Sequence, residues 1–478
     1  MSSLAAFLVR ALAGGMLFTA TGAGVATVLR LPRRALPIRL GWSYLLGVAY
    51  LGGALYATSH LFLFPLRRSV VLAIAALPVA AAAVRRRPSP AAPSGRTTWR
   101  AGELALVVAA GFVGSLMSLA VLAEAASSPP TDWDGRMTWC AQARFIRGAR
   151  TVDAPVLREA RWYVTHPRYP VLLPLAQVAV EEVLDAAEDD RVVRPLYALF
   201  LPALLLVVYD SASRLAGRRI AALWTLVAAM TPFLAWKNGG AGGCYSDLPL
   251  GCFFGGGLAI LCLGPRRLST GLSGGLLLGA GVLTKNEGLP FAILALGALA
   301  LASTRHARLR PWRDPRLLGA LCVVAATAAL LFSWRSAIPN RYDDFFFETA
   351  SPGALASGLA RNGKEILGCV TALMASRASW GFLWFALPML AALGWRGLLR
   401  RRALPLWIAP ACAALVILAA YTLVTGDVVA FVVGSWNRFL VEVSIPVFLV
   451  GAVATRGLLC PRQGSSERSG RVTSGAEG

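Results

Sequence analysis

Charged side chains are scarce in this sequence, and their scarcity excludes a soluble globular domain. Only 15% of the 478 residues are charged, while 56% are hydrophobic and the mean hydropathy is +0.61. A soluble domain has about 25% charged residues. Apolar runs of about 20 residues, the length that crosses a hydrocarbon core, recur along the chain. We therefore predict an all-α polytopic membrane protein.

Acidic residues are the rarer charged class, with 24 Asp and Glu against 47 Lys and Arg. A basic balance can indicate a nucleic-acid partner, but such a partner requires one continuous basic face on a soluble module. Here the arginines cluster in short links between apolar runs, for example at 85–87 and 400–402. Such links stay cytoplasmic under the positive-inside rule. We predict no nucleic-acid partner and a multi-pass protein of the plasma (inner) membrane, in contact with its lipids.

The eight cysteines form no CxxC pair and no Cys/His pattern, so neither a metal site nor a disulfide framework is predicted. Cys140 and Cys244 are expected on one side of the membrane, but nothing in the sequence predicts that they meet. No cofactor is predicted, although the sequence leaves open whether a divalent metal assists.

The hydrophobic runs predict about thirteen membrane-spanning helices. They are expected at residues 8–29, 41–64, 69–84, 103–124, 193–211, 218–236, 247–264, 272–285, 288–304, 317–336, 380–397, 404–425 and 440–456. If the arginine-rich link 85–100 is cytoplasmic, every later arginine cluster is too, and only the Arg67–Arg68 link is misplaced on the outer side. We divide the chain into N-terminal helices (1–100), a second transmembrane module (101–456) with the long outer segments, and a disordered cytoplasmic tail (457–478).

The same alternation places the chemically distinctive segments on the extracytoplasmic face. They are residues 125–192, 237–246, 285–287, 337–379 and 426–439. Within the first, 135–148 and 171–184 are too short and too polar to span, as interfacial helices are. All three lysines of the chain, Lys237, Lys285 and Lys364, lie on this face, which we therefore expect to be the active side.

Two acidic pairs lie on the outer side. Asp132 and Asp134 follow the end of a predicted span, where a carboxylate beside apolar and aromatic groups can act as a general base. Alternatively, they solvate the loop or cap the helix that follows. Asp343 and Asp344 could hold a metal ion, while the adjacent phenylalanines suggest an interfacial anchor.

Lys285, Asn286 and Glu287 interrupt what would otherwise be a pair of apolar spans. Ionisable groups at membrane depth are functional by default once they are buried. A plain hairpin whose charges reach water is the alternative. Arg438 lies on the predicted outer side, opposite the other arginine clusters, so topology does not explain it. A guanidinium is suited to bind a phosphate.

Two further outer segments carry polar groups. His166, Arg168 and Tyr169 occur next to Pro167 and Pro170, ahead of residues 171–184, where a functional role and simple turn geometry both remain open. Tyr245 and Asp247 follow a glycine-rich loop that permits close approach of a ligand. That loop lacks the GxxxxGK[ST] pattern, so it is not a P-loop.

The chain resembles the GT-C superfamily of membrane glycosyltransferases, in the branch similar to the RgtA/B/C/D-like bacterial enzymes. Protein mannosyltransferases and aminoarabinose transferases are more distantly similar. The motifs that carry the resemblance lie in order within residues 100–455 and read WDGRMTWCAQARFIRG, HPRYPVLLP, YSDLPL, LTKNEGL and WNRFLVEVSIP. One departure is Gln142, where the pattern has a basic residue.

The resemblance implies a GT-C-like fold and sugar transfer from a polyprenyl-phosphate donor to an acceptor hydroxyl, with inversion, in cell-envelope glycan or glycolipid synthesis. The acceptor would be a lipid, a glycan or a protein. Asp134 would be the base, with Asp132 as second candidate, while Lys285 and Arg438 would stabilise the leaving phosphate. The substrate pocket would be shaped by the remaining candidates: His166, Arg168, Tyr169, Tyr245, Asp247, Asn286 and Glu287.

A transporter or flippase of lipid-linked sugars is the main alternative. Transporters usually carry inverted repeats and discontinuous helices near the midplane. No internal repeat is found, and the polar groups gather at the predicted outer edge, which favours an enzyme.

Overall fold

A computed structural model describes residues 4–32, 34–85, 100–186, 189–236, 238–307, 313–339 and 350–459. All regular structure within these ranges is helical, as the composition predicts. Lys237, Asp343, Asp344, most of the 85–100 link and the tail from 460 onward lie outside them.

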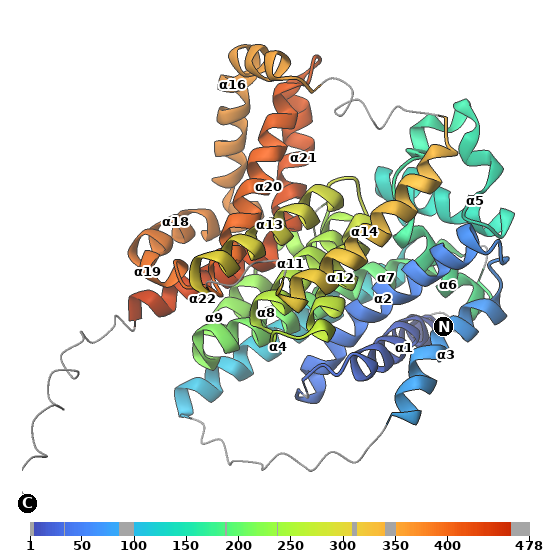
Figure 1. Cartoon of the computed structure of the whole chain (residues 1–478), viewed down its shortest axis with the longest axis horizontal. Helices are drawn as coiled ribbons and strands as arrows, with labels where there is room; N and C mark the ends of the chain where they lie inside the picture. Colours follow the sequence, from blue (N-terminus) through green and yellow to red (C-terminus); the bar gives the residue numbers. More distant parts are fainter. Residues whose placement is uncertain are drawn as a thin grey trace, which may run out of the picture.

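The helices pack side by side around a central bundle, and α16, α20 and α21 extend from it at the top of Figure 1. One π-helical turn covers Gly135–Cys140, and single 3-10 turns cover Pro155–Arg158, Ala160–Thr165 and Asp190–Val192. The helices are α1 (Leu4–Val28), α2 (Leu36–Leu61), α3 (Arg68–Val84), α4 (Ala101–Ser127), α5 (Ala141–Ala149), α6 (Leu172–Leu184), α7 (Arg194–Ala198), α8 (Phe200–Ala216), α9 (Arg218–Ala229), α10 (Pro232–Ala235), α11 (Asp247–Leu263), α12 (Leu268–Val282), α13 (Gly288–Ala307), α14 (Pro315–Ser336), α16 (Pro352–Met374), α17 (Arg377–Trp380), α18 (Leu383–Leu393), α19 (Trp395–Leu398), α20 (Leu404–Thr422), α21 (Val428–Glu442) and α22 (Ser444–Leu459).

Five helical segments of the described chain are long and apolar enough to cross a membrane, or six if α21 and α22, which meet at a 59° bend, form one broken span. The five are Val9–Val28, Ala101–Ser127, Asp190–Ala216, Pro315–Ser336 and Leu404–Thr422. These helices support a helical membrane protein, but the predicted count of about thirteen is not confirmed. Several predicted spans form helices that are too short. For example, α3, α11 and α12 have 17, 17 and 15 residues, against the about 20 that a full crossing needs.

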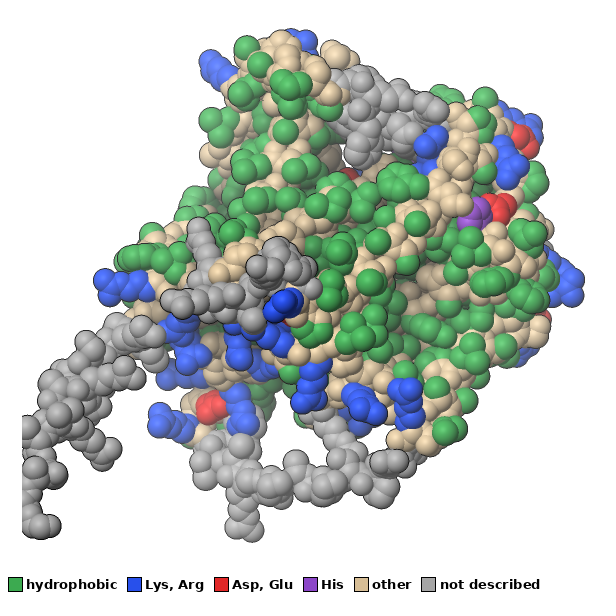
Figure 2. Space-filling model, viewed as in Figure 1, with side chains coloured by type: hydrophobic (Ala, Val, Ile, Leu, Met, Phe, Trp, Pro, Cys, Tyr) green, Lys and Arg blue, Asp and Glu red, His purple; other side chains and the backbone are tan. Residues whose placement is uncertain are grey.

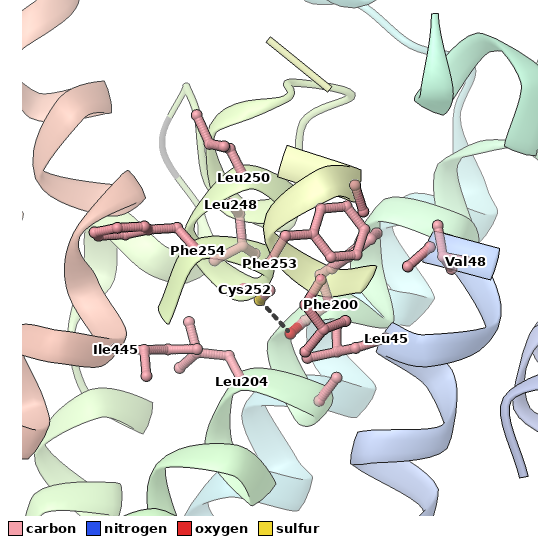
Figure 3. Close-up of a cluster of buried hydrophobic side chains, with 14 of the residues drawn as sticks. Leu45, Val48, Phe200, Leu204, Leu248, Leu250, Cys252, Phe253, Phe254 and Ile445 are labelled. Carbon is pink, nitrogen blue, oxygen red and sulfur yellow. Dashed lines mark hydrogen bonds between the residues drawn. The ribbon is translucent and has the colours of Figure 1, made fainter. Parts of the chain in front are cut away.

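Helix α11 runs through the middle of the bundle and is buried along its whole length. Figure 3 shows its Phe253 beside Phe200 of α8, with Ile445 of α22 beside Leu204. A helix that is apolar all round is stable only when other helices or lipid enclose it. Here other helices enclose it, and they hold its first residue, Asp247, in a set position.

The two ends of α11 differ in chemistry. At its C-terminal end, the carbonyl of Leu261 accepts a hydrogen bond from Arg316 at 2.7 Å, and the carbonyl of Leu263 accepts one from Arg214. Asp247 lies at the other end, about 25 Å away for a 17-residue helix. The arginine-rich links and the candidate site therefore lie at opposite ends of the bundle. Figure 2 shows Lys and Arg side chains gathered along its lower edge, with apolar side chains over the middle.

Three segments differ from the sequence-based expectation. Helix α16 occupies most of the expected outer loop 337–379. Helix α21 covers residues 428–439 of the expected outer loop 426–439. It begins after Asp427, whose carboxylate caps it by accepting a hydrogen bond from the N–H of Ala430 at 2.9 Å. Arg438 therefore projects from a helix. The expected interfacial helix 171–184 forms as α6, but protein buries its residues 172–181, so it is a core element.

Candidate active site

Six charged side chains from four parts of the chain form one ion cluster, and five of them are predicted site residues. Lys285 Nζ lies 2.9 Å from Asp247 Oδ1 and 2.6 Å from Glu442 Oε1. Glu287 Oε1 is 3.2 Å from the same ammonium. Arg438 pairs with Asp247 Oδ2 at 3.0 Å and with Asp134 Oδ2 at 2.8 Å. The ion cluster is thus Asp134, Asp247, Lys285, Glu287, Arg438 and Glu442.

The inner part of the ion cluster is withdrawn from solvent. Asp247 is 0% exposed, Glu442 1% and Lys285 7%. Charges at such positions are stable only as partners of one another, because each loses its hydration on burial. The hairpin alternative, in which Lys285 reaches water, is therefore not what the structure shows. Asp134 and Arg438 form the outer part, with 29% and 21% of their side chains exposed.

Close helix approaches bring the inner charges together. A Cβ on Gly288 would lie 1.9 Å from the carbonyl oxygen of Gly281, so only glycine permits the tight turn between α12 and α13 that carries Lys285. A Cβ on Gly251 would lie 2.6 Å from the carbonyl oxygen of Val441. This contact brings α11 against α21 and thereby places Asp247 beside Glu442.

The two aspartates of the first acidic pair have different surroundings. Asp132 accepts a hydrogen bond from the backbone of Cys244, and burial raises the pKa of Asp132 above its usual range. Asp134 instead faces Arg438, and it makes no capping hydrogen bond to the π-helical turn that follows it. The geometry therefore assigns Asp132 to holding the loop and leaves Asp134 at the opening of the ion cluster.

Tyr245 lies against the outer cation. The guanidinium carbon of Arg438 is 4.7 Å from the centre of the Tyr245 ring, a cation–π distance. Burial, with the nearby charge of Asp134, raises the pKa of Tyr245 to about 12. Its phenol is therefore a hydrogen-bond donor at neutral pH.

The THPRYP segment forms an aromatic wall in the same 125–192 region as Asp134. His166 stacks on Tyr169 with ring centres 4.8 Å apart, and Tyr169 lies 5.8 Å from Trp139 of the π-helical turn. Gln142 donates through its side-chain amide to the carbonyls of Thr165 and His166, at 3.1 and 2.7 Å. Gln142 thus holds this wall against α5.

Asn286 and Arg168 are linked through a residue that the sequence analysis did not single out. Arg335 of α14 donates to the side-chain oxygen of Asn286 and, at 2.9 Å, to the backbone carbonyl of Arg168. The Arg168 side chain in turn donates to the carbonyl of Ile338 at 3.1 Å. The structure thus joins Asp134, Asp247, Lys285, Glu287 and Arg438 by ion pairs, places Tyr245 against Arg438, and links Asn286 to Arg168 through Arg335. His166 and Tyr169 contact each other, and Asp132 is bonded to the backbone of Cys244.

Two other features were missed. Glu442 lies four residues after Arg438 and hence on the same helical face. A carboxylate inside the apolar run FLVEVSIP was the available signal. Cys140 and Cys244, whose meeting the sequence left open, make side-chain contact, and burial raises the pKa of Cys244. Both are free thiols in the structure.

Within the described ranges, no group of three or more His, Cys, Asp or Glu side chains is arranged to hold a metal ion. Comparison of the chain with protein-family models, curated proteins and solved structures found no match.

Proposed function

We propose that this protein is a GT-C-type membrane glycosyltransferase, which moves a sugar from a polyprenyl-phosphate donor to an acceptor hydroxyl on the extracytoplasmic face. The observation that carries the proposal is the 2.8 Å pair between Asp134 and Arg438. It joins the candidate base to the candidate phosphate-binding cation at the open edge of a buried ion cluster. A transferase needs these two groups on either side of the bond that breaks.

The charges of the ion cluster indicate how a donor would bind. Four carboxylates surround two cations, so an incoming phosphate has to replace a carboxylate. Asp247 is fully buried, whereas Asp134 is partly exposed. The donor phosphate therefore takes the place of Asp134 on Arg438, and the released carboxylate turns to the acceptor hydroxyl.

In the transfer step, Asp134 takes the proton of the acceptor hydroxyl as its oxygen attacks the anomeric carbon. The bond from that carbon to the phosphate oxygen breaks, and polyprenyl phosphate leaves with the electron pair. Arg438, with Lys285 behind it, stabilises the developing negative charge. A single displacement of this kind inverts the anomeric centre. Tyr245 offers a hydrogen-bond donor for the sugar, and the half-buried His166 and Tyr169 offer ring surface, with the buried Trp139 supporting Tyr169.

The proposal is tested by incubating the purified protein in detergent with a panel of polyprenyl-phosphate sugars and measuring released polyprenyl phosphate. We expect release with one donor, at least 100-fold slower in Asp134→Ala, which should still insert into the membrane. General-base catalysis contributes roughly 10²–10⁴-fold. Asp132→Asn is the matched variant and should retain most activity. Full activity in Asp134→Ala would refute the assignment.

One observation favours the rival function. The 59° break between α21 and α22 resembles the discontinuous helices of transporters. Translocation of a lipid-linked sugar across proteoliposomes, without turnover of any donor, would establish a flippase instead.

A further inference from the structure

A second basic site lies away from the ion cluster, where the turn between α2 and α3 meets the ends of α5 and α6. A cavity of about 520 Å³ opens there at the surface. Its lining residues are Arg67, Arg68, Ser69, Leu72, Arg150 and Glu182. Such a volume is within the range of small-molecule sites. The Leu66 N–H donates to the carbonyl of Arg150 at 2.8 Å and joins the two walls.

The cavity carries a positive charge that protein groups do not neutralise. Among the described residues, no carboxylate or carbonyl accepts a bond from the guanidinium groups of Arg67, Arg68 or Arg150. The one acid in the lining, Glu182, is already paired with Arg147 at 3.1 Å. The first turn of α3 also has no side-chain cap, so its N–H dipoles add to the positive potential. The cavity is therefore built for an anion.

Topology does not account for these arginines. Arg34, near the start of α2, pairs with Asp210 at the arginine-rich end of the bundle, whereas the cavity lies at the other end of this 26-residue helix. The two ends of this helix are about 39 Å apart. The cavity shares its end with the segment that carries Asp134. The positive-inside rule keeps the arginines of short links on the cytoplasmic side, so Arg67 and Arg68, in a short link at this end, require another explanation.

Apolar side chains flank the cavity on the same elements. Leu61, Phe62, Leu63 and Phe64, which lead into it, are each more than half exposed. From Leu72 in the cavity wall, an exposed stripe continues along α3 through Ala76 and Val79. Figure 1 shows α3 at the periphery, beside α1 and α6. An anion site that continues into an exposed apolar stripe matches an amphiphile, with a charged head and a hydrocarbon chain.

We propose that this cavity binds the phosphate headgroup of an anionic phospholipid, whose acyl chain lies along α3. The three guanidinium groups contact the phosphate oxygens, since guanidinium geometry matches phosphate. The exposed Leu61–Phe64 turn contacts the neighbouring lipid. This site would anchor the 125–192 segment to the bilayer, and it does not depend on the proposed transferase activity.

The test is a titration of the full-length protein in detergent with a fluorescent short-chain phosphatidylglycerol, followed by anisotropy. We expect saturable binding that weakens at least tenfold in Arg67→Gln/Arg68→Gln and in Arg150→Gln. The matched control is Arg219→Gln, an exposed arginine outside the cavity. An equal loss in that control would mean non-specific attraction and overturn the proposal, as would absence of saturable binding in the wild-type protein.

Two further arms separate lipid from free phosphate. Leu72→Ser should weaken the lipid at least threefold without changing binding of inorganic phosphate. Inorganic phosphate that competes at the same concentration as the lipid would overturn the lipid assignment and indicate a soluble anion. We expect each variant to unfold at the same temperature as the wild-type protein, because the substituted arginines are exposed. Weaker binding then reflects the cavity and not a loss of folding.

Discussion

Lys285 is the residue on which the inner charges depend. Asp247 and Glu442 are almost fully buried and both lie within 3 Å of its ammonium, at 2.9 and 2.6 Å. The interrupted apolar run made Lys285 and Glu287 predictable as unusual. Their pairing with Asp247 and Glu442 was not predictable. A single sequence shows which charged residues would be costly to bury, but it does not show which of them contact one another.

Removing the Lys285 ammonium should destabilise the folded protein strongly. Lys285→Met leaves two carboxylates buried with one fewer cation, a change that costs about 3–5 kcal/mol. The double variant Lys285→Met/Glu442→Gln should recover part of this loss, because one uncompensated charge is removed. Thermal unfolding in detergent measures both. The exposed Lys364→Met is the control, and equal melting of Lys285→Met and Lys364→Met would show that the buried pairs contribute nothing.

At the scale of elements, the helices were more predictable than their contacts. The runs at 103–124, 317–336 and 404–425 all form helices near the expected bounds. The burial of α6 was not anticipated, because its polar Gln177 and Glu181 suggested a surface, whereas Gln177 donates to the Tyr197 hydroxyl inside the protein at 2.7 Å. Polar content alone does not separate an interfacial helix from a core helix whose polar groups are bonded.

The turn between α12 and α13 should tolerate no side chain at its glycine. Gly288→Ala places a Cβ against the Gly281 carbonyl and should cost about 1–3 kcal/mol, as overpacking does, and disturb Lys285. Gly297 lies in the same helix, and a Cβ added there would meet no atom within 4 Å. Gly297→Ala should instead stabilise by about 0.5–1 kcal/mol. Thermal unfolding of the two variants should shift in opposite directions, and equal shifts would contradict the close approach.

At the scale of the whole molecule, the arginine-rich links lie at one end of the bundle and the candidate site lies at the other. The separation of the arginine-rich links from the candidate site was predictable, since it follows from alternating apolar runs and charge. The number of crossings was not, because hydropathy does not give helix length, and α11 and α12 have 17 and 15 residues against the about 20 of a full crossing. The bend between α21 and α22 was likewise not predicted, because residues 426–439 were expected as an outer segment and only 440–456 as a span.

Helix α4 offers the clearest test of orientation. Its 27 residues, Ala101–Ser127, span about 40 Å, and both end residues are exposed. In intact cells, a membrane-impermeant maleimide should label Ser127→Cys, on the side of the candidate site. Ala101→Cys should react only after permeabilisation. Labelling is compared with that of the wild-type chain, whose Cys322 is also exposed. Reaction of both positions from one side would contradict a crossing by α4.

The ion cluster also imposes an order on biosynthesis. Asp247 and Lys285 are 38 residues apart and can pair soon after both leave the ribosome, but Glu442 follows Lys285 by 157 residues. At roughly 5–20 residues per second, that interval lasts about 8 to 30 seconds. Arg438 and Glu442 arrive on α21, nearly the last helix to be made. A nascent chain therefore inserts most of its helices before the cluster can close, and a chain truncated before α21 has an open, incomplete site.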